Sequence, residues 1–207
     1  MPDLRFQVNS AEPVPLAVAP TIALKLNVTN ATPEPIHSVS LRCQIQIESP
    51  KRRYAENEQK RLIDLFGEPS RWGQTLRSML WANTSLVAGP FESSIDVDLP
   101  VACTYDFNVA VAKYFDALDT GDVPLLLLFS GTVFYANSEG VLQIEQIPWS
   151  RECAFRLPVQ VWKDMMQLYY PNSAWLCLRK DVFDRLHEYK MREGMPTWEQ
   201  ALESILP

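Results

Sequence analysis

Glycine is scarce in this chain of 207 residues, which contains 7 glycines and 16 prolines. Globular proteins contain roughly 7% glycine and 5% proline, so the usual ratio is reversed. Loops that cradle phosphate groups and the tight turns that carry nucleophilic serines depend on glycine. The sequence therefore leaves little room for a nucleotide-binding loop. It contains no GxSxG motif, and we interpret Ser130-Gly131, the nearest approach to one, as structural.

Metal-ligating side chains are also few and scattered. The chain has two histidines and four cysteines, with no CxxC pair, so a local zinc signature is absent. His37, Cys103 and Cys153 are a set that folding could bring together, but their spacing does not require it. We predict no metal and no cofactor. Each cysteine lies in an apolar stretch, which predicts buried and reduced thiols. The cysteines are Cys43, Cys103, Cys153 and Cys177.

Long apolar runs and positive net charge are missing as well. The longest apolar stretch, 123–129, is far shorter than the about 20 residues that a membrane-spanning helix needs. The net charge is −6, whereas general nucleic-acid binding requires a basic surface. Residues 1–5 lack the basic and apolar parts of a signal peptide. The sequence predicts a soluble, cytoplasmic protein with no membrane span and no nucleic-acid partner.

What the chain has in abundance is alternation of apolar and polar side chains. Residues 4–8, 22–28, 39–47, 95–101 and 105–111 all alternate with a period of two. This period is typical of strands that bury one face and expose the other, which antiparallel sheets tolerate. Most of the prolines fall between these runs, where a missing N–H does not break a ladder, and Pro100 indicates an edge strand.

The middle of the chain adds one apolar strand and one interruption. Residues 123–135 are mostly apolar and predict a central strand buried on both faces, followed by a hairpin turn at 137–140. Residues 51–66 are rich in charged side chains and predict a short helix or an ordered excursion from the sheet. The segment 74–87 fits a helix turn and a strand equally well.

The period changes to that of a helix after Pro158. Val161, Met165 and Leu168 predict a first helix, Asp181 is a candidate cap for a second, and Thr197 for a third. The predicted fold is mainly β: an antiparallel β-sandwich over residues 1–157, with an immunoglobulin-like arrangement as one option. A helical C-terminal segment, 158–207, is expected to pack on the sandwich and form one unit with it.

Two clusters of charge admit a functional and a structural interpretation. Asp96 and Asp98, with Glu92 nearby, resemble the paired carboxylates of glycoside hydrolases or a calcium site, but they also fit a solvated strand face. The basic residues of 51–53 and 60–61 could contact phosphate or an acidic partner. Acidic residues alternate with them, which is typical of a solvated helix, and we favour the solvated face in both cases.

Several strings of this sequence resemble, as a set, an uncharacterised bacterial family of similar length. The genes of that family often lie beside those of actinobacterial-type, high-affinity nickel–iron hydrogenases. The strings are SVSLRCQI at 38–45, LFG at 65–67, RWGQTLR at 71–77, DLPVACTYDF at 98–107, AKYF at 112–115, LFSGTVFY at 128–135, IPW at 147–149 and YPNSAWL at 170–176. The resemblance implies an accessory protein and supplies no catalytic residues.

The resemblance and the missing catalytic motifs favour a non-catalytic accessory, scaffold or assembly protein. Its partner would be a hydrogenase subunit or a maturation factor. Interaction surfaces are enriched in exposed aromatic residues and arginine, which selects Arg71, Trp72, Trp149, Tyr170 and Trp175 as candidates. A chain with six tryptophans also fits a carbohydrate-binding sandwich, and the acidic pair leaves a hydrolase as a further alternative. The sequence does not determine the oligomeric state.

Overall fold

A computed structural model describes residues 2–104 and 108–206 of the chain. The chain divides into two units, Met1–Asn172 and Ser173–Pro207. The first unit contains all eight strands of the described residues, and the second contains two helices. The first C-terminal helix belongs to the unit of the strands, so the division falls later than the expected boundary at 158. The packing of residues 173–207 on the sandwich stays a prediction.

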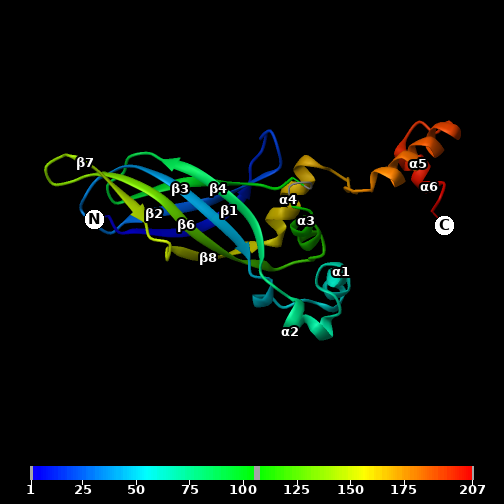
Figure 1. The fold of residues 1–207 in the computed structure, drawn as a ribbon, viewed down its shortest axis with the longest axis horizontal. Coiled ribbons are helices and arrows are strands. Elements are labelled where there is room, and N and C mark those ends of the chain that lie inside the picture. Colours follow the sequence, from blue (N-terminus) through cyan, green and yellow to red (C-terminus); the bar gives the residue numbers. More distant parts are fainter. Residues whose placement is uncertain (1, 105–107, 207) are drawn as a thin grey trace. The chain divides into compact units, whose positions relative to one another are not determined.

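The first unit is an antiparallel β-sandwich (Figure 1), so the predicted mainly β fold is confirmed. A three-stranded sheet has the order β1-β2-β5, and a five-stranded sheet has the order β4-β3-β6, with both β7 and β8 paired to β6. The strands are β1 (Leu4–Pro13), β2 (Thr21–Asn30), β3 (Ile36–Ile47), β4 (Met79–Ala88), β5 (Ser94–Ala102), β6 (Asp122–Ala136), β7 (Leu142–Ile147) and β8 (Glu152–Pro158).

The strand order follows that of immunoglobulin-like sandwiches. In those folds strands 1, 2 and 5 share one sheet, and strands 3, 6 and 7 share the other. The same sets are found here, with β4 placed beside β3 in the second sheet. Pro100 lies in β5, an edge strand, as its missing N–H predicts.

Alternating side chains build the core between the sheets. Along β3, Leu41, Cys43 and Ile45 are buried and the residues between them face outward. Phe6 of β1 stacks on Phe129 of β6 with 4.2 Å between the ring centroids, which joins the two inner faces directly. The core is therefore formed by the residues that the period of two selects.

Helices close one end of the sandwich, opposite the β6–β7 hairpin (Figure 1). Trp162 of α4 (Val159–Tyr169) stacks on Phe115 of α3 (Val109–Asp116) with 4.4 Å between the ring centroids. The ring of Trp81 in β4 lies 5.3 Å from that of Phe115, so two tryptophans close this end. The Tyr169 hydroxyl donates to Val14 O at 2.7 Å and ties α4 to the end of β1. The helices are α1 (Glu56–Phe66), α2 (Trp72–Thr75), α3 (Val109–Asp116), α4 (Val159–Tyr169), α5 (Lys180–Arg192) and α6 (Trp198–Glu203).

Two local predictions are wrong. Residues 109–111 belong to α3 rather than to a strand, because Val111, Ala112, Tyr114 and Phe115 are buried with the spacing of a helix and Asn108 caps its first turn. The rest of that predicted strand, 105–107, lies outside the described residues. The helix α5 begins after Arg179, so Asp181 lies in its first turn instead of capping it.

The second edge of the five-stranded sheet is one strand split in two. The pairs run from Ala136↔Leu142 to Gly131↔Ile147 in β7, and from Leu128↔Glu152 to Asp122↔Pro158 in β8. Four residues, 148–151, therefore stand opposite two residues of β6. This arrangement is an enlarged, irregular bulge, and its central residues lie out of the ladder.

Candidate binding surfaces

The excursion between β3 and β4 is organised by a buried ion pair. The Arg52 guanidinium donates to Glu58 Oε1 at 3.1 Å and to the carbonyl oxygens of Thr120 and Asp122, while Glu58 Oε2 accepts from the Ala55 N–H at 3.0 Å. The two side chains are only 7% and 4% exposed. The interpretation of 51–53 as solvated is therefore wrong for Arg52, which supports the α1 excursion instead of facing water.

The pKa of Glu58 reflects this environment. Burial alone would raise the pKa of this carboxyl, but the backbone N–H groups of Asp119 and Ala55 and the Arg52 guanidinium outweigh burial and lower it from its ordinary value. Glu58 thus stays ionised in the interior because three donors point at it. This chemistry is structural, since the carboxylate is enclosed by its own partners.

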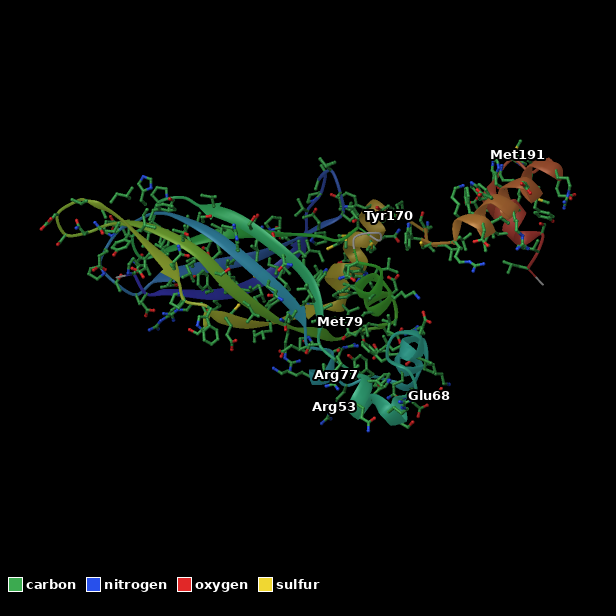
Figure 2. The ribbon with its side chains drawn as sticks, viewed as in Figure 1. Arg53, Glu68, Arg77, Met79, Tyr170 and Met191 are labelled. Carbon is green, nitrogen blue, oxygen red and sulfur yellow. The ribbon has the colours of Figure 1, made fainter. Side chains whose placement is uncertain are left out.

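Two of the predicted partner residues lie on this excursion. The Trp72 ring packs edge-on against Tyr54 and Phe66, and its indole N–H donates to Gly67 O at 2.9 Å. Trp72 is half-buried and helps hold the excursion together, whereas its neighbour Arg71 is exposed. Figure 2 shows the side chains of this region, with Arg53, Glu68 and Arg77 labelled.

The other three predicted residues lie in different places. Tyr170 follows α4, is half-buried and packs against the core (Figure 2). Trp149 lies in the β7–β8 bulge and is 89% exposed. Trp175 belongs to the second unit and is 41% exposed. Within the first unit, Tyr170, Trp149 and the pair Arg71 and Trp72 therefore lie in three different segments of the chain, and Trp175 lies in the second unit.

Trp149 borders a depression on the outer face of the five-stranded sheet, with a volume of about 570 Å³. The strand register places its side chains in two rows across β4, β3 and β6, with Asn83, Gln44 and Leu128 in one row and Ser85, Arg42 and Ser130 in the next. We call this surface the Trp149 face; it consists of Arg42, Gln44, Asn83, Ser85, Leu128, Ser130 and Trp149.

The outer face of the three-stranded sheet differs because its polar groups satisfy one another. Lys25 forms ion pairs with Asp98 at 2.9 Å and with Glu12 at 2.7 Å, and the Asn27 amide donates to Asp96 at 2.8 Å. These contacts raise the pKa of Lys25. The acidic pair is thus bound to its neighbours across the strands, as the solvated-face interpretation predicts.

No described contact activates a nucleophile. Within residues 2–104 and 108–206, no histidine is hydrogen-bonded to Ser130, and His37 contacts Ser38 at 3.4 Å. In the same residues no group of three or more metal-ligating side chains could hold an ion. Burial raises the pKa of the Cys43 thiol, and it raises that of Cys103 to about 12, so these thiols are poor nucleophiles. Cys177 is exposed, so the prediction that all four cysteines are buried is wrong.

The second unit presents an apolar groove. Phe183 of α5 and Trp198 of α6 pack with 5.3 Å between their ring centroids, and His187 lies 5.9 Å from Trp198. Ala201 is the only buried hydrophobic residue among the described residues of this unit. A groove of about 390 Å³ is lined by Lys180 and six apolar side chains. We call these six the apolar groove: Leu176, Leu178, Phe183, Leu186, Trp198 and Leu202.

A protein-family model matches the entire chain, residues 1–207, and its description is "Family of unknown function (DUF6084)". The chain belongs to this family. No curated protein matches the sequence. None of the described helices is long and apolar enough to cross a membrane.

Solved structures show only distant likeness. A β-glucosidase from Kluyveromyces marxianus (10% identity, TM-score 0.28) and β-glucosidase 3B from Thermotoga neapolitana in complex with α-D-glucose (11%, 0.27) each match 75% of this chain. The matched parts are 15% and 17% of those chains, so this DUF6084 protein spans a small part of their length. The putative ApaA protein from Bordetella pertussis matches 75% of this chain over 94% of its own (15%, 0.23). TM-scores this low carry no argument for function.

Sequence reasoning selected Trp149 but missed the residues around it. Arg42, Gln44, Asn83 and Ser85 lie on the polar side of two strands, and β4 could not be assigned from the sequence. The polar positions of the alternating run 39–47 could have identified Arg42 and Gln44, because they mark the face of the strand that points outward. Their partners on β4 follow only from the register of the sheet.

Proposed function

We propose that this protein is a non-catalytic accessory protein that binds a partner protein through the apolar groove of residues 173–207. One observation carries the proposal: the described residues of this helical unit, 173–206, include a single buried hydrophobic residue, while Leu176 and Leu206 are 67% and 66% exposed. Below about 40 residues, a unit without disulfides or metals generally needs a further surface to complete its core.

The groove has the chemistry of a protein-docking site. Leucines and two aromatic rings line it, and Lys180 stands at its edge with Asp184 as its ion-pair partner at 2.7 Å. Contiguous apolar surface of this kind marks protein interfaces in soluble proteins. An apolar, helix-sized surface on the partner fits this groove better than a charged ligand does.

The resemblance of the sequence to a hydrogenase-associated family suggests the identity of the partner protein. We propose a subunit or a maturation factor of a nickel–iron hydrogenase, in the cytoplasm, with this protein acting as scaffold or assembly factor. The contacts of Asp96 and Asp98 fit a binding role, because their carboxylates accept from Asn27 and Lys25 of the neighbouring strand.

Co-purification from the native organism tests the proposal. Tagged full-length protein is expected to retain hydrogenase subunits or maturation factors, identified by mass spectrometry, and Leu176→Asp is expected to lose them because the charge enters the groove. Leu142→Asp is the matched control, since Leu142 is a similarly exposed leucine on β7. Deletion of the gene is expected to lower hydrogenase activity.

Three results would contradict the proposal. Hydrogenase activity that is unchanged in the deletion strain would remove the proposed role. Loss of co-purification in both leucine variants would show that the groove is not the binding site. A wild-type protein that dimerises in size-exclusion chromatography, with Leu176→Asp monomeric and no hydrogenase component retained, would assign the groove to a second copy of the chain.

A further inference from the structure

The Trp149 face carries polar side chains that have no hydrogen-bond or ion-pair partner among the residues that the structure describes. Among residues 2–104 and 108–206, no carboxylate lies within ion-pair distance of Arg42, and the amides of Gln44 and Asn83 make no hydrogen bond. On the other sheet, Lys25, Asn27, Asp96 and Asp98 are mutually bonded. The two outer faces are therefore built differently, and only the Trp149 face leaves its donors and acceptors available.

The backbone of β3, the central strand of this face, is engaged in ladders with β4 on one side and β6 on the other. At the centre of the face a ligand would therefore meet side chains: amides and hydroxyls, which both donate and accept, and one guanidinium, which only donates. Groups that donate and accept suit the hydroxyls of a sugar. A guanidinium suits a carboxylate, to which it can donate two parallel hydrogen bonds.

Trp149 supplies an apolar plane beside these polar groups. The bulge at 148–151 holds the Trp149 ring outside the ladder and almost fully in solvent. An indole in this position contributes little packing energy to the fold. An aromatic ring next to hydrogen-bonding groups matches a ligand with one apolar face and a polar rim. A pyranose ring has this form, since its C–H bonds form one face and its hydroxyls surround it.

The volume and charge of the depression further restrict the class of ligand that it fits. Its volume of about 570 Å³ lies within the roughly 300–1,000 Å³ of small-ligand sites. Arg42 is the only charged residue that lines it, so one negative charge on the ligand is matched. The several phosphates of a nucleic acid would lack partners here, and the protein carries a net charge of −6.

We propose that the Trp149 face is a binding site for an acidic saccharide, in which Trp149 stacks on a sugar ring and Arg42 binds the carboxylate of a uronate. Gln44, Asn83, Ser85 and Ser130 contact the sugar hydroxyls. This site lies in the first unit and the apolar groove lies in the second. Failure of one proposal would therefore leave the other unaffected.

Isothermal titration calorimetry of the full-length protein tests this site. The probes are short oligosaccharides of galacturonate, glucuronate and mannuronate, each beside its neutral methyl ester. The wild type is expected to bind at least one uronate and to bind its ester at least about tenfold more weakly. Trp149→Ala is expected to weaken binding of both forms at least about tenfold, and Arg42→Gln to remove the preference for the acid.

Two matched variants serve as controls. Trp175→Ala removes an exposed tryptophan of the other unit, and Arg5→Gln removes an exposed arginine of β1; both are expected to bind as the wild type does. All substituted side chains are exposed or half-buried, and circular dichroism checks the fold of each variant. No binding of any uronate at millimolar concentration, equal binding of acid and ester, or unchanged binding by Trp149→Ala would overturn the proposal.

Discussion

At the scale of single residues, Arg52 and Glu58 show how a charged sequence becomes part of the interior. The run 51–61 reads as a solvated helix because most of its side chains are charged. One basic and one acidic residue of this run nevertheless pair inside, where backbone carbonyl groups accept from Arg52 and backbone N–H groups donate to Glu58. A single sequence cannot identify such a pair, since the partners at 119–122 come from a distant segment.

We predict that Glu58→Gln lowers the free energy of unfolding by about 3–5 kcal/mol, because it leaves the Arg52 charge buried without a counter-ion. Urea denaturation measures the change. Glu56→Gln is the control: Glu56 lies in the same first turn but is exposed, and its substitution is expected to change stability by less than about 0.5 kcal/mol. Equal effects of the two substitutions would show that the ion pair contributes nothing.

The same carboxyl makes stability depend on pH. Its pKa is lowered in the folded protein from the ordinary value of 4.5, so its contribution is complete above that value and is lost as the pH falls through the folded pKa. Glu58→Gln is therefore expected to lose less stability than the wild type between roughly pH 5 and pH 3. Parallel losses in the two proteins, measured by urea denaturation at each pH, would contradict this assignment.

At the scale of elements, strand β6 depends on Gly131 at the point where its edge partner changes from β8 to β7. The residue has φ +140°, which side-chain-bearing residues rarely adopt, and a Cβ added there would lie 2.0 Å from Ser40 O. The close approach of β3 to β6 at this point therefore requires glycine. One of the few glycines of the chain therefore lies where β6 pairs with β3 on one side and β7 on the other.

Gly131→Ala is expected to destabilise the protein by more than about 3 kcal/mol, because the backbone strain and the clash with Ser40 add together. Gly89→Ala is the control, since a Cβ at Gly89 meets no atom within 4 Å. Its effect is expected to stay within about 0.5 kcal/mol. Thermal unfolding followed by circular dichroism compares them, and similar melting temperatures for the two variants would show that β3 and β6 can separate at low cost.

Most elements of the sandwich follow from the sequence because their burial alternates. The period alone predicts strands at 4–8, 22–28 and 39–47 and a helix through Val161, Met165 and Leu168, and β1, β2, β3 and α4 contain these residues and extend beyond them. The strand β4 was not, since Ala82 is buried beside Trp81 where a bulge shifts the register between Ile45 and Gln46. The exposure of Trp149 could not be predicted either, because it depends on the pairing of two strands with a third.

At the scale of the whole molecule, the two units differ in what holds them together. Among residues 2–104 and 108–206, every buried hydrophobic residue except Ala201 lies in the first unit. The first unit therefore contains an extended core of its own, whereas the described part of residues 173–207 buries a single hydrophobic side chain. The composition of the helices agrees with this difference, because apolar residues make up most of α4, whereas charged residues outnumber apolar ones in α5, which has no buried residue.

We predict that a chain ending at Asn172 folds cooperatively, with a melting temperature within a few degrees of the full-length value, since it keeps the core. Circular dichroism measures the transition. The shortened chain is also expected to lose the protein partner and to keep the acidic saccharide. A truncated chain without a cooperative transition would instead support the packing of 158–207 on the sandwich as one unit.

The split between β7 and β8 also affects the solubility of the fold. An exposed edge strand offers a row of free backbone groups to which another chain can add, and long regular edges promote aggregation. Here the edge beside β6 consists of ladders of only six and seven residues, separated by the bulge at 148–151, whose central residues leave the ladder. The bulge that exposes Trp149 thus also prevents this edge from serving as a continuous template for another strand.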